Sequence, residues 1–145
     1  MDELHGEAKQ STGGMKFSLK TTPHYAVFTL EEKNLNAAIA PELKSKFVVL
    51  SNEGIKRLIL DLSQLEFVDS SGLSAILTAD RLWGGEQGSF ILTGIHQPSV
   101  KKLISISRLD KVLNILPTTS EAEDYFMMEE LERQITAEPD EELDE

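Results

Sequence analysis

The sequence predicts an α/β fold, with a single domain built on a mixed, mostly parallel sheet of about five strands and about four helices. Short β-rich apolar runs alternate with segments whose apolar residues recur at helical spacing. The run Ile55–Leu62 has no polar interruption from Leu58 to Leu60, as expected of a strand covered on both sheet faces. The expected order is two strands and a helix, then three strand–helix units, which implies crossover helices.

Five strands are predicted from β-branched and aromatic residues bounded by turn residues. Thr22-Pro23 separates the first two, and the polar loop Glu31–Asn36 follows the second. The strands are Met15–Lys20, Tyr25–Leu30, Ile55–Leu62, Ser89–Gly94 and Val112–Leu116.

Four helices are predicted from their start signals and their apolar faces. The first begins at Ala40-Pro41, the second follows Asp69 and closes at Trp83-Gly84-Gly85, and the third begins at Pro98. The last begins with the capping box Ser120-Glu-Ala-Glu123 and ends at Pro139. In the first three helices the inward residues are Leu43, Phe47, Leu50, Leu73, Ile76, Leu77, Val100, Leu103 and Ile104, and the last helix has Met128, Leu131 and Ile135 on one side.

The predicted organisation has four parts. Residues 1–14 form a flexible leader that ends in Ser11-Thr-Gly-Gly14, and residues 15–118 form the domain. Residues 119–137 form a C-terminal helix that packs on the domain or extends it, and 138–145 form a disordered acidic tail. The N-terminus is polar and acidic rather than a secretory signal, so we expect a cytoplasmic protein.

The charge of the chain is concentrated near its C-terminus. Residues 121–145 hold 12 acids and one base, Arg133, which account for the whole net charge of -11, whereas the other 120 residues carry 13 acids and 13 bases. Such a segment repels nucleic-acid backbones and anionic membranes, so we expect neither as a partner. Two interpretations stay open, a solubilising end and a docking segment for a basic partner.

Several kinds of chemistry are missing. Cysteine is absent, which excludes disulfides, thiolate zinc sites and cysteine nucleophiles. Neither the Gly-x-x-x-x-Gly-Lys loop nor the Gly-x-Gly-x-x-Gly fingerprint occurs, and His5, His24 and His96 are scattered. No run approaches the roughly 18 to 20 apolar residues of a membrane span. We therefore expect a protein that is not an enzyme, with no catalytic residue, metal or cofactor.

The most informative segment is Asp69-Ser70-Ser71-Gly72, between an apolar strand and an apolar-faced helix. It places two hydroxyls at a helix N-terminus, where backbone N–H groups point outward and negative charge is favoured. A serine there can simply cap the helix, or it can carry a phosphate as a switch. Without a positioned base, neither Ser70 nor Ser71 is expected to be a hydrolytic nucleophile.

The segment Leu60–Leu77, with Asp69-Ser-Ser-Gly-Leu73 at its centre, resembles the STAS domain family and, within it, the bacterial anti-sigma-factor antagonists. The resemblance covers about residues 15 to 118. Two further stretches are similar to the family. Leu35–Leu43 is similar to its Leu-Asp-Ala-x-x-Ala-Pro-x-Leu segment, and Gly88–Gly94 with Val100–Ile104 is similar to its fourth strand and third helix.

The resemblance implies a phosphorylation switch. In the family, an anti-sigma factor that is also a serine kinase phosphorylates the serine after the aspartate, which is Ser70 here, with Ser71 as the alternative. The unphosphorylated antagonist binds the anti-sigma factor and frees a sigma factor, and a phosphatase resets the cycle. The implied partner surface consists of Asn34, Asn36, Asp69, Ser70, Ser71 and Gly72, on a monomer or weak dimer.

One departure from the family falls in that surface. The frequent Gly-Glu-Leu-Asp turn appears here as Lys33-Asn34-Leu35-Asn36, so both acids have become amides. The alternative function for such a domain is a scaffold subunit of a signalling complex or of a lipid-transport ATPase, in which the serine is not phosphorylated and only caps the helix.

Overall fold

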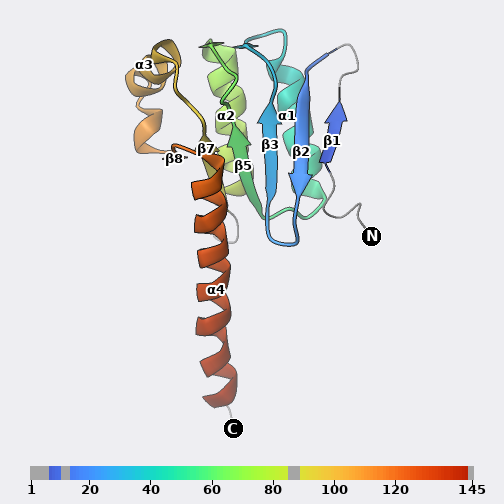
Figure 1. Cartoon of the computed structure of the whole chain (residues 1–145), viewed down its shortest axis with the longest axis vertical. Helices are drawn as coiled ribbons and strands as arrows, with labels where there is room; N and C mark the ends of the chain where they lie inside the picture. Colours follow the sequence, from blue (N-terminus) through green and yellow to red (C-terminus); the bar gives the residue numbers. More distant parts are fainter. Residues whose placement is uncertain (1–6, 11–13, 85–88, 144–145) are drawn as a thin grey trace.

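The computed structural model describes residues 7–10, 14–84 and 89–143, in which a mixed sheet lies between helices on its two faces (Figure 1). The sheet has six strands in the order β1-β2-β3-β5-β7-β8. β1, β2 and β3 pair antiparallel, whereas β3, β5, β7 and β8 run parallel. The strands are β1 Glu7–Gln10, β2 Phe17–Thr21, β3 Ala26–Leu30, β5 Arg57–Asp61, β7 Ser89–Thr93 and β8 Asn114–Leu116.

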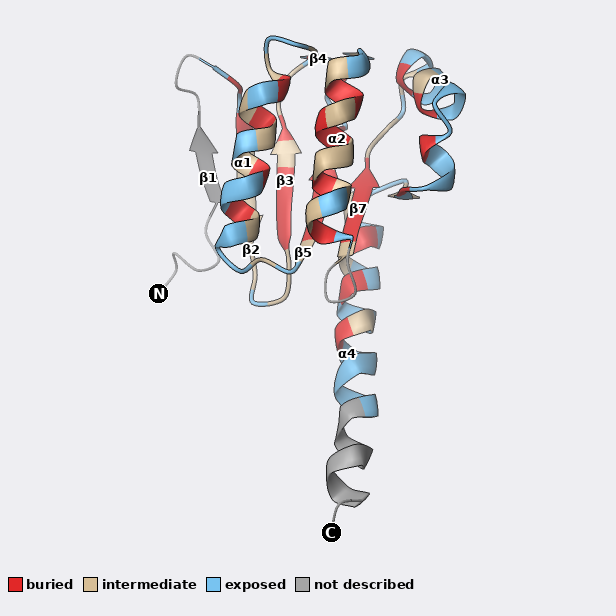
Figure 2. Ribbon diagram, turned by 180° about the vertical axis from the view of Figure 1, so that it is seen from behind, coloured by how far each residue is buried: buried red, intermediate tan, exposed pale blue. Residues whose placement is uncertain are grey.

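Helices α1 and α2 cover one face of the sheet, and α4 lies against the other face and continues well beyond its end (Figures 1 and 2). The predicted mixed α/β fold is confirmed, including the strand and helix order. The helices are α1 Ala40–Asn52, α2 Ser70–Trp83, α3 Pro98–Ile106 and α4 Thr119–Leu143, with a 3-10 turn at Leu109–Lys111.

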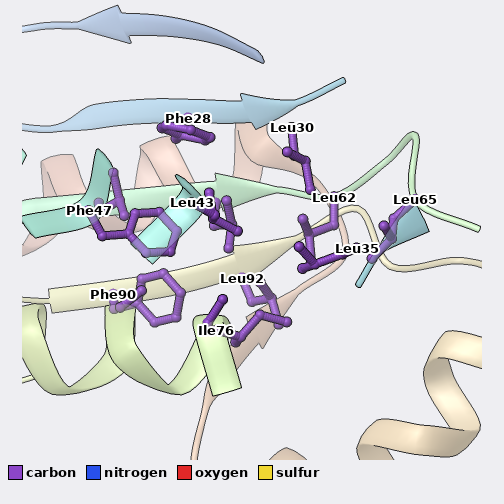
Figure 3. Packing of buried hydrophobic residues seen from close by; sticks show 14 of the residues in the cluster. Phe28, Leu30, Leu35, Leu43, Phe47, Leu62, Leu65, Ile76, Phe90 and Leu92 are labelled. Carbon is purple, nitrogen blue, oxygen red and sulfur yellow. The ribbon is translucent and has the colours of Figure 1, made fainter. Parts of the chain in front are cut away.

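The main core lies between the sheet and α1 and α2. Its aromatic rings form a continuous row of contacts. Phe28 stacks on Phe17 at 4.7 Å between centroids, Phe47 packs edge-on to Phe28 at 5.6 Å, and Trp83 packs edge-on to Phe47 at 5.8 Å. Figure 3 shows part of this cluster, including Leu35, Phe47 and Phe90. The residues predicted to face inward from α1, α2 and α3 are buried, apart from Leu77 and Leu103, which are partly buried against the same cluster.

A smaller core lies on the other face of the sheet. There Val27, Ile59 and Ile91 contact Ala122 and Phe126 of α4. Alternate residues of each strand therefore face the two cores, which explains why the strand predicted at Ile55–Leu62 carries no polar residue from Leu58 to Leu60.

Some elements differ from the prediction. The expected leader 1–14 contains β1, which pairs with β2 from Glu7 opposite Lys20 to Gln10 opposite Phe17, because an edge strand is held by backbone hydrogen bonds and needs no apolar pattern. Residues 1–6 and 11–13 of that leader lie outside the described residues. The expected loop Glu31–Asn36 contains β4 (Asn34–Leu35), which pairs parallel with β6 (Phe67–Val68). The last strand begins at Asn114 rather than Val112, since the 3-10 turn occupies the residues before it.

Helix α4 begins and ends at other residues than predicted. Thr118 Oγ1 accepts from the Glu121 backbone N at 3.1 Å, so the cap is Thr118 and not Ser120. The Glu123 carboxylate, predicted to complete the capping box, instead accepts from Lys20 Nζ at 2.8 Å and Tyr25 Oη at 2.9 Å on the sheet. The helix passes Pro139 and reaches Leu143, because proline keeps a helical φ and the glutamates and leucine after it favour helix. Residues 144–145 of the expected tail lie outside the described residues.

A chain of ion pairs joins α4 to the sheet. Arg57 of β5 contacts Glu129 at 3.3 Å and Glu130 at 3.1 Å, and Arg133 contacts Glu130 at 2.7 Å. Hydrogen bonds from Arg133 and Gln134 lower the pKa of Glu130 from 4.5 to about 2. Burial and the hydrogen bond to Glu123 raise the pKa of Tyr25 from 10.0 to about 12.

Acid is expected to weaken the attachment of α4 to the sheet. Because the pKa of Glu130 is lower in the folded protein than in the unfolded chain, its stabilising effect is complete above about pH 4.5 and is lost as pH falls toward 2. Circular dichroism of urea unfolding at several pH values should show Glu130→Gln less stable than wild type near pH 6, with the difference vanishing near pH 2.

Glu132→Gln is the control for this pH dependence, since Glu132 makes no ion pair with any described residue. It should follow the wild-type pH profile throughout. A stability difference between Glu130→Gln and wild type that stays constant from pH 6 to pH 2 would contradict the assignment.

Candidate functional site

The segment Asp69–Gly72 joins β6 to the first turn of α2. Asp69 is the N-cap residue, with φ -114° and ψ -171°, and its Oδ1 accepts from the Gly72 backbone N at 3.0 Å. The aspartate thus satisfies one of the free N–H groups that every helix start exposes. The capping role, which the sequence left open for Ser70 or Ser71, belongs to Asp69.

The two serines follow the cap. Ser70 is exposed and Ser71 is partly buried. Within the part of the chain that the structure describes, neither hydroxyl takes part in a hydrogen bond. Both lie at the N-terminus of a 14-residue helix, where the peptide dipoles favour negative charge. The hydroxyl of Ser70 is therefore free of any structural task and open to solvent.

The short parallel pair of β4 and β6 brings the Lys33–Asn36 turn beside the start of α2. Asn34 lies opposite Phe67, and the Leu35 carbonyl accepts from the Asp69 backbone N at 3.2 Å. Gly72 makes this approach possible, because a Cβ there would lie 2.5 Å from the Leu35 carbonyl oxygen. Gly72 is buried, so it lies beneath the predicted partner surface rather than on it.

The two amides of the predicted surface have different surroundings. Asn36 is partly buried, and its Oδ1 accepts from the Ala38 backbone N at 3.0 Å, while its backbone carbonyl accepts from Ala40 N at 2.8 Å. This turn leads the chain into α1, and aspartate or asparagine is common in turns that are closed by such a side-chain hydrogen bond. Asn34 is exposed. Of the two asparagines, Asn34 is therefore the more accessible.

A shallow groove of about 360 Å³ runs between the first turns of α1 and α2, lined by Ala37, Ala40, Pro41, Lys44, Ser70, Ser71 and Ser74. Sequence reasoning missed Lys44, which the packing of α1 beside α2 brings to the serines. It also missed Phe67 on β6, whose side chain is 59% exposed three residues before Ser70. An exposed aromatic beside a polar patch is typical of a binding surface, and periodicity within one element could not reveal either neighbour.

Other features of the described residues point less clearly to a site. A larger open concavity of about 1230 Å³ lies between α4 and the β2–β3 turn, where Glu130 pairs with both Arg57 and Arg133. Among the described residues, no cluster of three or more histidine and acidic side chains is arranged for a metal ion. No described helix has the length and apolar character to cross a membrane.

Comparisons with known proteins agree on the family. A model of the STAS domain matches residues 16–122. A Thermotoga maritima protein named as a candidate anti-sigma factor antagonist is 31% identical over 108 residues, which cover 74% of this chain and 90% of that protein. A crystal structure of a candidate antagonist from that species superposes with a TM-score of 0.67 at 27% identity, covering 77% of this chain and 94% of the other.

A further similar structure is the Bacillus cell fate determinant SpoIIAA in its phosphorylated form, with a TM-score of 0.59 and 25% identity over 75% of this chain and 97% of that one. The family match spans β2 to the start of α4, so it includes every strand of the sheet except β1, both helices of the main core and the Asp69–Gly72 junction. The resemblance read from the sequence is confirmed: this protein belongs to the STAS domain family.

Proposed function

We propose that this protein is an anti-sigma factor antagonist whose binding is switched by phosphorylation of Ser70. The observation that carries the proposal is the position of Ser70, which is exposed at the start of α2 and does not cap the helix, because Asp69 does. The unphosphorylated protein binds an anti-sigma factor that is also a serine kinase and so frees a sigma factor. Phosphate on Ser70 ends that complex, and a phosphatase restores the hydroxyl.

The relatives support this proposal. The Thermotoga protein carries the name of an anti-sigma factor antagonist, and SpoIIAA has been solved in a phosphorylated form. On this reading the protein is a cytoplasmic binding module rather than an enzyme, and it requires no cofactor. Asn34 on β4, Phe67 on β6 and Asp69 before α2 form, together with Ser70, the surface that the anti-sigma factor contacts, with Ser71 as the alternative acceptor.

The physics of the site fits a switch that acts on binding and spares the fold. Phosphate adds about -1.5 to -2 charges at neutral pH. The dipole of α2 favours an anion at this position by about 0.3–1 kcal/mol, and Lys44 lines the same groove. A partner surface that fits a neutral hydroxyl would have to bury the new charge without compensation, which is strongly unfavourable.

Phosphopeptide mass spectrometry on the protein isolated from its native cells, in growth and under stress, tests the proposal. Trypsin should release Leu58–Arg81, which also contains Ser63, Ser71, Ser74 and Thr78, so backbone fragment ions from cleavage between Ser70 and Ser71 are needed to locate the phosphate. We expect phosphate on Ser70 that changes with condition.

Phosphate found only on Ser71 would move the switch by one residue. Reliable coverage of Leu58–Arg81 without phosphate in any condition would overturn the proposal and favour the unphosphorylated scaffold subunit of a signalling complex or lipid-transport ATPase.

A further inference from the structure

The face of α4 that points away from the sheet carries large apolar residues. Met128, Leu131 and Ile135, which we call the outer stripe, are 57%, 50% and 58% exposed. On the opposite side of the helix, Ala122 and Phe126 are completely buried. Successive residues of an α-helix are about 100° apart, so Met128, two residues after Phe126, lies about 200° around from it. The outer stripe therefore faces away from the smaller core.

The fold does not use the outer stripe. Ala122 and Phe126 supply the apolar contacts of α4 with the sheet, and Glu123 and Glu130 supply its ion pairs. Single exposed apolar residues are normal, but three at the spacing i, i+3 and i+7 form a continuous strip along a helix. Such a strip is the usual contact of one amphipathic helix with another. Because α4 projects beyond the sheet, this face is accessible (Figures 1 and 2).

The acids in the first part of α4, from Glu121 to Glu132, form two groups. Glu123, Glu129 and Glu130 have basic partners on the sheet or on α4 itself. The second group is exposed and makes no ion pair with any residue in the described ranges; it consists of Glu121, Asp124 and Glu132. Asp124 and Glu132 lie four residues before and four residues after Met128, so both border the outer stripe.

This combination selects the occupant. An apolar strip bordered by unpaired carboxylates is complementary to an amphipathic helix whose apolar residues are flanked by lysine or arginine. A second copy of α4 would bring the same carboxylates together, and an anionic membrane would repel them. We propose that the outer stripe of α4 binds a basic amphipathic helix of a partner protein.

The surface is separate from the phosphorylation site. α2 begins at the end of the sheet opposite to the one beyond which α4 projects (Figures 1 and 2). The outer stripe thus gives the protein a second contact region, which does not depend on the state of Ser70. Ser70→Asp should leave this binding unchanged, and that result separates the inference from the proposed function.

The test uses the full chain and three designed peptides of about three heptads each. The first has a leucine stripe flanked by lysines, the second has the same stripe flanked by glutamates, and the third has the composition of the first in a scrambled order. By isothermal titration, the first should bind one-to-one and at least tenfold more tightly than either of the others.

Variants then locate the binding. Replacing Met128, Leu131 and Ile135 together by glutamine, which keeps a good helix former at each position, should weaken the lysine-flanked peptide at least tenfold. Glu121→Gln, Asp124→Asn and Glu132→Gln together should weaken it and remove its dependence on salt. The matched control is Val48→Gln with Val49→Gln, which removes an equally exposed apolar pair from α1 and should change nothing.

Three results would overturn the inference. Equal binding of the scrambled peptide would show attraction by charge alone, without a stripe. A wild-type dimer in sedimentation velocity that the glutamine triple variant dissolves would make a second copy the occupant. Binding to mixed phosphatidylcholine and phosphatidylglycerol vesicles that the triple variant abolishes would make it a membrane.

Discussion

Ser70→Asp is expected to weaken binding of the anti-sigma factor by about a hundredfold or more, with the unfolding midpoint in urea unchanged. The carboxylate places a permanent negative charge where the proposed interface fits a hydroxyl, and a mismatch of about 3 kcal/mol corresponds to that change in Kd. The fold itself tolerates the charge, since Ser70 is exposed at the N-terminus of α2. Titration calorimetry with the kinase partner and urea unfolding together measure both quantities.

Two variants define the specificity of this effect. Ser120→Asp adds the same charge to another exposed serine in the first turn of a helix, α4, on the other face of the sheet, and should bind like wild type. Ser70→Ala keeps the site neutral and should stay bound in the presence of the kinase and ATP. If Ser70→Asp binds as tightly as Ser120→Asp, Ser70 is not the switch.

The sequence was sufficient to predict five of the six strands of the main sheet and the helices α1, α2 and α3. In β5 and β7 every residue near the middle is apolar, and in α1 the residues Leu43, Phe47 and Leu50 repeat at helical spacing, so burial follows from the pattern within one element. β1 and the β4–β6 pair carry no such pattern. They are short, and backbone hydrogen bonds to a distant partner strand hold them, so no local signal marks them.

Helix α4 shows why an apolar stripe does not establish which face of a helix is buried. Met128, Leu131 and Ile135 do lie on one side, as predicted, but they are exposed, and the side that packs is marked by Ala122 and Phe126. Glu130 adds to the difficulty, since a buried glutamate interrupts the apolar character of the packed side and is held there by Arg57 and Arg133. The apolar contacts of Ala122 and Phe126, together with the ion pair from Arg57 to Glu130, thus accompany a helix orientation that the longer apolar stripe alone would not indicate.

The candidate site was only partly predictable for a similar reason. Asp69, Ser70 and Gly72 lie in one short segment between the strand and the helix that position them, so their arrangement follows from one motif. Lys44 reaches the site from α1, and only the packing of α1 beside α2 brings it there. Phe67 lies next to the motif in the sequence, but the sequence pattern does not reveal that its side chain is exposed. The amide pair Asn34 and Asn36 looked equivalent in the sequence, yet a turn hydrogen bond occupies the Asn36 side chain, whereas Asn34 is exposed.

Trp83→Ala is expected to have the largest effect on stability. Trp83 ends α2, is 2% exposed, packs edge-on to Phe47 at 5.8 Å and donates from Nε1 to the Ile55 carbonyl at 2.8 Å. Truncation of a buried tryptophan costs about 3–5 kcal/mol, a large part of the roughly 5–15 kcal/mol that stabilises a typical domain. Urea unfolding followed by circular dichroism should show the free energy of unfolding lowered by that amount.

Trp83→Phe separates the ring contact from the hydrogen bond, because it keeps an aromatic ring against Phe47 and leaves the Ile55 carbonyl without its donor, at an expected cost of about 1–3 kcal/mol. Fourteen helical residues place Trp83 about 20 Å from Ser70. Below its unfolding temperature, Trp83→Ala should therefore bind the anti-sigma factor like wild type, the reverse of Ser70→Asp. A loss of binding in folded Trp83→Ala would show that the core beneath α2 and the surface around Ser70 are coupled, and a loss of stability below about 1 kcal/mol would show that the ring is not packed as described.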